Sequence, residues 1–125
     1  GNPMLEIRFL TDTYSGIALA HFPRDWRGFR YFAFRAYNPE PTALEVVCRI
    51  NDRRHNRDGY HYRDRFNRRL GLPPGWSQIR LPIEEIATSL VGRRMELDDI
   101  LQVGIFTVSL PTPRTLYLDD VRLLP

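Results

Sequence analysis

Lysine is absent from this 125-residue chain, so all 18 of its basic side chains are arginine. A GC-rich genome explains such a bias simply, because arginine codons are GC-rich. Arginine also suits planar, bidentate recognition of carboxylate or phosphate groups better than lysine does. The 15 acidic residues leave a formal net charge of only +3 and are mixed among the arginines. No clean basic stripe results, and nucleic-acid binding is therefore not predicted.

Cysteine occurs once, at Cys48, which excludes an internal disulfide and a cysteine-based zinc site. No apolar run approaches the ~20 residues that a membrane-spanning helix needs, so this domain is not expected to insert directly into a membrane. The opening "GNPM" resembles a cloning remnant rather than a targeting signal. We expect residues 2–125 to form one domain taken from a larger protein.

The signatures of catalysis are missing too. There is no Gly-x-Ser-x-Gly elbow and no glycine-rich phosphate loop. Cys48 has the parity of a core residue, which indicates a buried hydrophobe rather than a reactive thiol. Asp52 and Asp64 would be the carboxylate pair for glycoside hydrolysis, but 125 residues leave little chain to build a deep cleft. We predict no catalytic residue.

Alternation of apolar and polar side chains, with a period of two, is what the sequence has in quantity. In "ALEVVCRIN" every second residue from Leu44 to Ile50 is apolar, and Arg49 and Asn51 take the other side. Similar alternation or apolar runs cover residues 5–9, 17–19, 31–37, 62–70, 79–83, 101–110 and 114–125. The run 101–110 is almost entirely apolar, as in a strand covered on both faces.

Turn signals such as "NPEPT", "NRDG", "LPPGW" and "LPTPR" separate these runs. Only "PIEEIATSL" indicates a helix, of one or two turns, and a second helical turn is predicted in "ELDDI". About eight strands with little helix predict an all-β fold, an antiparallel β-sandwich or jelly roll.

Large polar side chains occupy the non-core parity of the middle strands. If those strands are neighbours, one sheet carries them all on its outer face: Arg35, Tyr37, Glu45, Arg49, Arg65, Asn67, Arg69 and Arg80. One interpretation is a solvated face with cross-strand ion pairs, such as Glu45 with a nearby arginine, worth ~0.2–1 kcal/mol each. The other is a platform that binds hydroxyl or carboxylate groups, with Tyr37 offering a flat ring.

The connection 51–61 carries Asp52, His55, Asp58 and His61, but in no spacing typical of a transition-metal site. Its histidines are more simply interpreted as loop residues that bond the local backbone. We expect the next strand to begin at Tyr62.

Two long stretches carry a family resemblance. The segment "IND...HN...Y..RFNRRLGLPPGWSQIRLPI", followed by "RTLYLDDVRL", resembles the carbohydrate-binding-module-like jelly rolls of the galactose-binding-domain-like superfamily, and "DWRGFRYFAFRAYNP" is similar to their opening. Such modules occur attached to bacterial glycoside hydrolases and to some exopolysaccharide-related or VanZ-like membrane proteins. The resemblance implies a noncatalytic sandwich that takes sugar on one face or loop edge, on the extracellular or periplasmic side.

The family pattern also implies a structural calcium that ties the first strand to the last. Asp119 in "LYLDDVRL" would be a ligand, with Glu6 or Asp12 as its partner. The alternative for Asp119 is a strand-end carboxylate satisfied by backbone N–H groups. No other cofactor is implied.

We therefore predict a noncatalytic module for carbohydrate, specifically an acidic bacterial polysaccharide. The predicted ligand-binding residues are Arg35, Tyr37, Arg49, Asp52, His55, Tyr62, Asp64, Arg65 and Asn67. Tyr60 is a further stacking candidate, as are Trp26 and Trp76, although a tryptophan at a turn more often fills the edge of a core. Two alternatives stay open: Asp52, His55, Asp64, Arg65 and Asn67 form an internal network that holds the long connection down, or the whole domain packs against a neighbouring domain of its parent protein.

Overall fold

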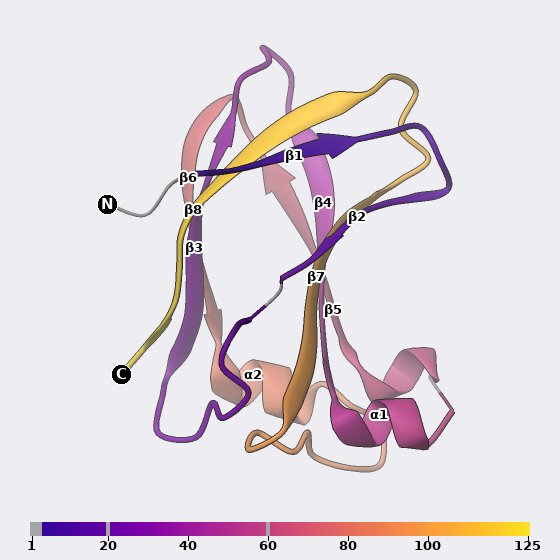
Figure 1. Cartoon of the computed structure of the whole chain (residues 1–125), viewed down its shortest axis with the longest axis vertical. Coiled ribbons are helices and arrows are strands. Elements are labelled where there is room, and N and C mark those ends of the chain that lie inside the picture. The colour runs from indigo at the N-terminus through magenta and orange to yellow at the C-terminus, as the bar shows by residue number, and fades with distance from the viewer. Residues whose placement is uncertain (1–3, 20, 60) are drawn as a thin grey trace.

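The computed structural model describes residues 4–19, 21–59 and 61–125, which form a two-layer antiparallel β-sandwich (Figure 1). Sheet A has the order β1-β8-β3-β6, and sheet B the order β2-β7-β4-β5. The strands of sheet A are β1 (Leu5–Phe9), β8 (Arg114–Leu124), β3 (Tyr31–Asn38) and β6 (Gly75–Pro82). Those of sheet B are β2 (Tyr14–Ala18), β7 (Ile100–Val108), β4 (Leu44–Asp52) and β5 (Phe66–Leu72). The predicted all-β sandwich is confirmed.

Helical segments are short, and α1 and α2 lie at the same end of the sandwich (Figure 1). They are α1 (Arg53–Arg57), the 3-10 turn η1 (Tyr62–Asp64) and α2 (Ile83–Thr88). The helix predicted in "PIEEIATSL" is confirmed by α2. Tyr62 does not begin a strand, because η1 comes first and β5 begins at Phe66. None of the described helices is long and apolar enough to span a membrane.

The prediction of a helical turn in "ELDDI" is wrong, because the structure has a single hydrogen-bonded turn and no helix in this segment. The Asp99 N–H donates to the Glu96 carbonyl at 3.1 Å and closes a single turn. The Asp99 carbonyl then accepts from the Arg53 N–H at 3.0 Å, and β7 begins at the next residue. The turn therefore ends against the start of α1 instead of continuing as a helix.

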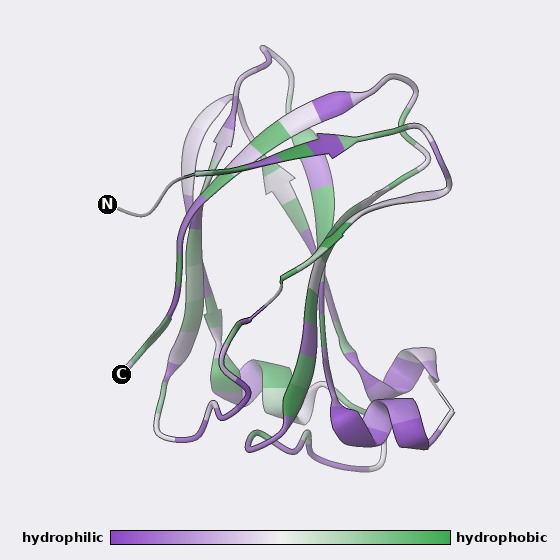
Figure 2. Cartoon of the chain, viewed as in Figure 1, coloured by the Kyte–Doolittle hydropathy of each residue, from purple (hydrophilic) through white to green (hydrophobic). Residues whose placement is uncertain are grey.

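The core lies between the sheets and follows the predicted alternation. Val46, Cys48 and Ile50 are fully buried, and Figure 2 shows hydrophobic colour along the strands and hydrophilic colour on α1. Burial raises the pKa of the Cys48 thiol to about 12, as fits an inert core residue. Trp26 is buried as predicted and stacks on Phe32, with 5.2 Å between ring centroids.

Candidate ligand-binding surface

The outer face of sheet B brings Arg49 together with small residues from neighbouring strands. Arg49 points away from the core because Cys48 and Ile50 point into it. In the register Arg49 is opposite Asn67 on β5 and Gly104 on β7, and Gly104 is opposite Ala18 on β2. The row therefore consists of Ala18 and Gly104, which have little or no side chain, followed by the guanidinium of Arg49 and the amide of Asn67.

A hollow of about 490 Å³ lies on this face, which we call the sheet B hollow. A Cβ built on Gly104 would lie 3.9 Å from Nε of Arg49, so the missing side chain leaves room directly beside that guanidinium. Serine, glutamine and aromatic groups complete the wall. The lining residues are Tyr14, Ser15, Gly16, Ile17, Ala18, Arg49, Arg65, Gln102, Gly104 and Phe106.

Two guanidinium groups, of Arg49 and Arg65, line the sheet B hollow without an ion pair to any carboxylate of the described residues. Nη2 of Arg49 reaches Oε1 of Gln102 at 3.5 Å, whereas Nε of each arginine is buried without a hydrogen-bond partner. Burial, and then the positive charge of Arg65, lower the pKa of the Arg49 guanidinium. An anionic group placed here would neutralise the repulsion between the two guanidinium groups and give them the counterion that they lack.

Other polar residues of sheet B and η1 contact Arg65 or pair with one another. The guanidinium of Arg65 lies over the ring of Tyr62, 5.1 Å from its centroid, and the Tyr62 side chain is largely exposed. Arg69 and Glu45 form the predicted cross-strand ion pair at 3.2 Å. Arg49, Arg65 and Asn67 thus lie together as predicted, although their role in binding stays a prediction. Tyr60 lies outside the described residues.

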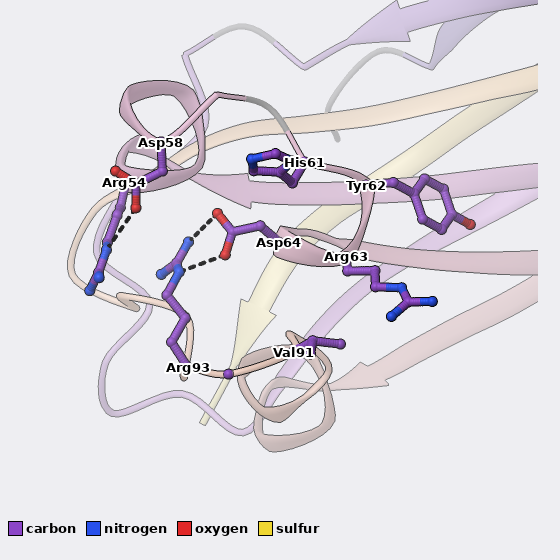
Figure 3. A pocket seen from close by; sticks show the side chains of 9 residues that line it. Arg54, Asp58, His61, Tyr62, Arg63, Asp64, Val91 and Arg93 are labelled. Carbon is purple, nitrogen blue, oxygen red and sulfur yellow. Dashed lines mark hydrogen bonds and ion pairs between the residues drawn. The ribbon is translucent and has the colours of Figure 1, made fainter.

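Asp52, His55 and Asp64 are held in an internal network around Arg93, which we call the Arg93 clamp. Arg93 donates to both oxygens of Asp52, at 2.7 and 2.8 Å. It also donates to both oxygens of Asp64, at 2.7 and 3.0 Å (Figure 3). Asp52 caps α1 by accepting from the His55 N–H at 2.9 Å, and it also accepts from the Glu96 N–H at 2.8 Å. For Asp52, His55 and Asp64 these contacts confirm the alternative of an internal network that fastens the connection after β4, whereas Arg65 lines the sheet B hollow instead.

Charges in the Arg93 clamp shift the pKa values of its members. Burial opposes ionisation of Asp52, but hydrogen bonds from Arg93 and from the N–H groups of Glu96 and His55 prevail and lower the pKa of its carboxyl. The hydrogen bonds from Arg93 lower the pKa of Asp64 against a smaller burial effect. Burial lowers the pKa of His55, although Asp64 lies 3.6 Å from its Nδ1. The clamp therefore holds two carboxylates and a histidine that favours its neutral form.

Arg35 and Tyr37 lie on the outer face of sheet A, so the expectation that all the predicted polar residues share one sheet face is wrong. The Tyr37 ring contacts the rings of Trp76 and Tyr117, at centroid distances of 5.1 and 6.3 Å. Trp76 is 46% exposed and does not fill a core edge, contrary to the tendency expected of a tryptophan at a turn.

Asp119 also lies on this face, where its Oδ2 is 3.5 Å from Nη1 of Arg35. The acidic partners predicted for a calcium cage, Glu6 and Asp12, do not gather with it. Within the described ranges, no three His, Cys, Asp or Glu side chains are arranged so that they could hold a metal ion. Asp119, Glu6 and Asp12 therefore do not by themselves make a calcium cage, and the structural calcium stays a prediction.

Sequence reasoning missed Gln102, Gly104 and Phe106, because the apolar run 101–110 predicts a strand covered on both faces. In the sandwich β7 is an inner strand of sheet B, with the core on one face and the open hollow on the other. The glycine inside that run was the available signal, since a strand glycine often marks a close approach or an open site. Arg93 carried no comparable signal.

Comparison with known proteins establishes the fold and leaves the family open. No protein-family model matches the chain, and no curated protein matches it. The agarase AgWH50C aligns with a TM-score of 0.73 and 17% identity, over 97% of this chain and 22% of its own. This chain therefore spans about a fifth of the length of that agarase.

Isolated modules match over most of their own length. The family 11 carbohydrate-binding module from Clostridium thermocellum, in complex with a β-1,3-1,4-mixed-linked tetrasaccharide, aligns with a TM-score of 0.67 and 13% identity, over 99% of this chain and 85% of the module. The family 30 module of cellulosomal cellulase Cel9D-Cel44B from the same organism gives 0.58 and 12%, over 98% and 75%. These likenesses confirm the jelly-roll resemblance at the level of the fold.

Proposed function

We propose that the chain is a noncatalytic carbohydrate-binding module whose sheet B hollow takes an acidic polysaccharide. The observation that carries this proposal is the pair Arg49 and Arg65, which line the hollow and form no ion pair with a carboxylate of the described residues. Uronate carboxylates or sulfate groups match such donors in charge and in planar geometry. The fold that the chain shares with carbohydrate-binding modules supports the same ligand class.

The rest of the lining supports binding of a sugar. Gln102 and Ser15 offer hydrogen-bonding groups for hydroxyls, while Phe106 and Tyr14 offer apolar ring surface. Among the residues that line the hollow there is no Asp, Glu, His or Cys. Glycoside hydrolysis needs a carboxyl pair and has no candidates here, which supports binding without catalysis.

Calorimetric titration with uronate and neutral oligosaccharides of equal length tests the proposal. We expect the uronate series to bind more tightly, and Arg49→Ala to weaken its binding by about tenfold or more, since a hydrogen bond to a charged group contributes ~1.5–3 kcal/mol. Arg57→Ala is the matched control, because it removes the same charge from an exposed position on α1. Equal weakening by both variants, or no binding of any oligosaccharide at millimolar concentration, contradicts the proposal.

Filling the hollow gives a second test that leaves both arginines in place. A Cβ on Gly104 makes only ordinary contacts, 3.6 Å to the Ile17 carbonyl and 3.9 Å to Arg49, so Gly104→Ala should keep most of the affinity. Gly104→Val adds branches that occupy the ligand's space and displace the guanidinium, and should abolish measurable uronate binding. Circular dichroism of both variants checks the fold. Undiminished binding by Gly104→Val would place the ligand elsewhere.

A further inference from the structure

Three aromatic side chains form a row across the outer face of sheet A, far from the residues of the sheet B hollow in the fold. The register aligns Tyr117 on β8 with Tyr37 on β3, and Tyr37 with Trp76 on β6. We call these three residues the aromatic row. Their rings contact one another through Tyr37, and Trp76 leaves nearly half of its surface in water.

A second row, directly beside the first, is polar. The register aligns Asp119, Arg35 and Gln78 on the same three strands. The Arg35 guanidinium lies 4.3 Å from the Trp76 ring centroid and reaches Asp119, while its Nε is buried without a hydrogen-bond partner. The face therefore has an orphaned donor next to a partly exposed ring.

The composition of these two rows differs from that of a sandwich core. None of their six side chains is aliphatic, and each row combines ring or polar groups from three strands. A saccharide has the complementary chemistry, because a pyranose ring presents C–H groups on its faces and hydroxyls at its edge. Aromatic rings suit the C–H faces of the sugar, and the Arg35, Asp119 and Gln78 side chains have the groups to hydrogen-bond its hydroxyls.

Charge on this face indicates a neutral saccharide. Arg35 and Asp119 form an ion pair at 3.5 Å, so the positive charge of Arg35 is neutralised. The arginines of the sheet B hollow, in contrast, keep their positive charge. We propose that the aromatic row and its polar neighbours form a second carbohydrate-binding surface, selective for neutral saccharides and independent of the sheet B hollow. The domain then carries two sugar sites, one for acidic and one for neutral saccharides.

Tryptophan fluorescence reports this surface specifically. The chain has two tryptophans, of which Trp26 is fully buried and Trp76 is 46% exposed. Acrylamide quenching therefore reports mainly on Trp76. We expect a neutral mixed-linked β-glucan tetrasaccharide or an agaro-oligosaccharide to reduce this quenching by about half or more, whereas an oligogalacturonate bound at the sheet B hollow leaves it unchanged.

Variants separate the two sites. Trp76→Ala should abolish calorimetric binding of the neutral oligosaccharides and leave oligogalacturonate binding as in the wild type. Trp76→Phe keeps a ring and should retain part of the neutral binding, which excludes unfolding as the cause. Val91→Ala, at an exposed apolar residue outside both faces, is the matched control and should change neither.

Three results would overturn this inference. The first is that no neutral oligosaccharide at millimolar concentration reduces the acrylamide quenching. The second is that Trp76→Ala still binds the neutral oligosaccharides as the wild type does. The third is protection of Trp76 that depends on protein concentration without sugar, which would identify the face as a contact between protein chains. Loss of oligogalacturonate binding in Arg49→Ala tests the sheet B hollow alone, so the two proposals fail separately.

Discussion

Arg49 and Arg93 carry the same side chain, and their partners give them different roles. Arg93 lies between Asp52 and Asp64 and uses its donors on two carboxylates. Arg49 reaches the amide of Gln102 at 3.5 Å and lies over the Phe106 ring, and it has no carboxylate partner among the described residues. The sequence alone does not distinguish the two arginines, because the partners of each come from strands or loops far away along the chain. We therefore expect Arg93 to stabilise the fold and propose Arg49 for binding.

Removing the guanidinium of the Arg93 clamp should strongly destabilise the fold. Arg93→Met leaves the buried carboxylate of Asp52 and that of Asp64 without their counterion, which we expect to lower the free energy of unfolding by ~3–5 kcal/mol. Urea unfolding measures the change. Arg94→Met is the control, because its pair with Glu84 is exposed and should contribute at most ~1 kcal/mol. A cost for Arg93→Met no larger than for Arg94→Met would show that the clamp does not stabilise the fold.

Acid should weaken the fold in two stages. The lowered pKa of His55 means that the unfolded chain takes up its proton first, so stability is complete above pH ~6.5 and is lost as pH falls through the lowered pKa. The lowered pKa values of Asp52 and Asp64 add stability that is complete above pH ~4 and is lost on further acidification through them. Urea unfolding at several pH values between 7.5 and 2.5 measures both stages.

His55→Gln provides the internal check on that pH profile. It should remove the stability change of the first stage while the second stage, which belongs to the carboxylates, persists. An unfolding free energy in the wild type that stays constant between pH 7.5 and 5, or a first stage unchanged in His55→Gln, would contradict the assignment.

At the scale of elements, alternation predicted which face each side chain takes within a strand but not which sheet the strand joins. Arg35 and Arg49 share the non-core parity and still lie on opposite outer faces, because β3 belongs to sheet A and β4 to sheet B. Strand order depends on pairings between distant segments, such as β3 with β8, that no local pattern records. The outward parity predicted for Arg35, Tyr37 and Arg49 was therefore correct, but these residues are divided between two sheets.

The short helix α1 was missed for a different reason. Its five residues are mostly arginine and polar, with no apolar periodicity, and only His55 is buried. Its stability comes from tertiary contacts, since Asp52 both caps the helix and binds Arg93. Asp52 was the one local signal, as aspartate is a favoured N-cap residue.

The close approach of β2 to β7 makes Gly16 indispensable. A Cβ on Gly16 would lie 2.1 Å from the Ile105 carbonyl oxygen, which is backbone and cannot rotate away. We expect Gly16→Ala to cost ~1–3 kcal/mol and to lower the melting temperature by several degrees, as measured by thermal unfolding. Gly71→Ala is the matched control on β5, where nothing lies within 4 Å, and should be neutral or slightly stabilising. Equal melting temperatures for the two variants would refute the steric argument.

At the scale of the molecule, the sandwich presents two open sheet faces on opposite sides of one core. Sheet B contributes unpaired guanidinium groups, whereas sheet A contributes rings beside a neutralised ion pair. A core shared by both sheets holds the faces in fixed relation, because packed interiors resist deformation. The two proposed sites therefore cannot contact the same stretch of a polysaccharide, and a module that uses both bridges two chains or two distant segments.

Bridging predicts a scattering signal that rests on both proposals. Titrating the protein into a long polysaccharide with alternating uronate and neutral residues should raise light scattering to a maximum and then lower it, because excess protein occupies each chain separately. Arg49→Ala or Trp76→Ala removes one of the two contacts and should abolish the maximum, although each variant still binds through its remaining face. Arg57→Ala should behave as the wild type. A maximum that persists in both single-face variants would mean that association between protein chains, rather than two sugar sites, produces the scattering.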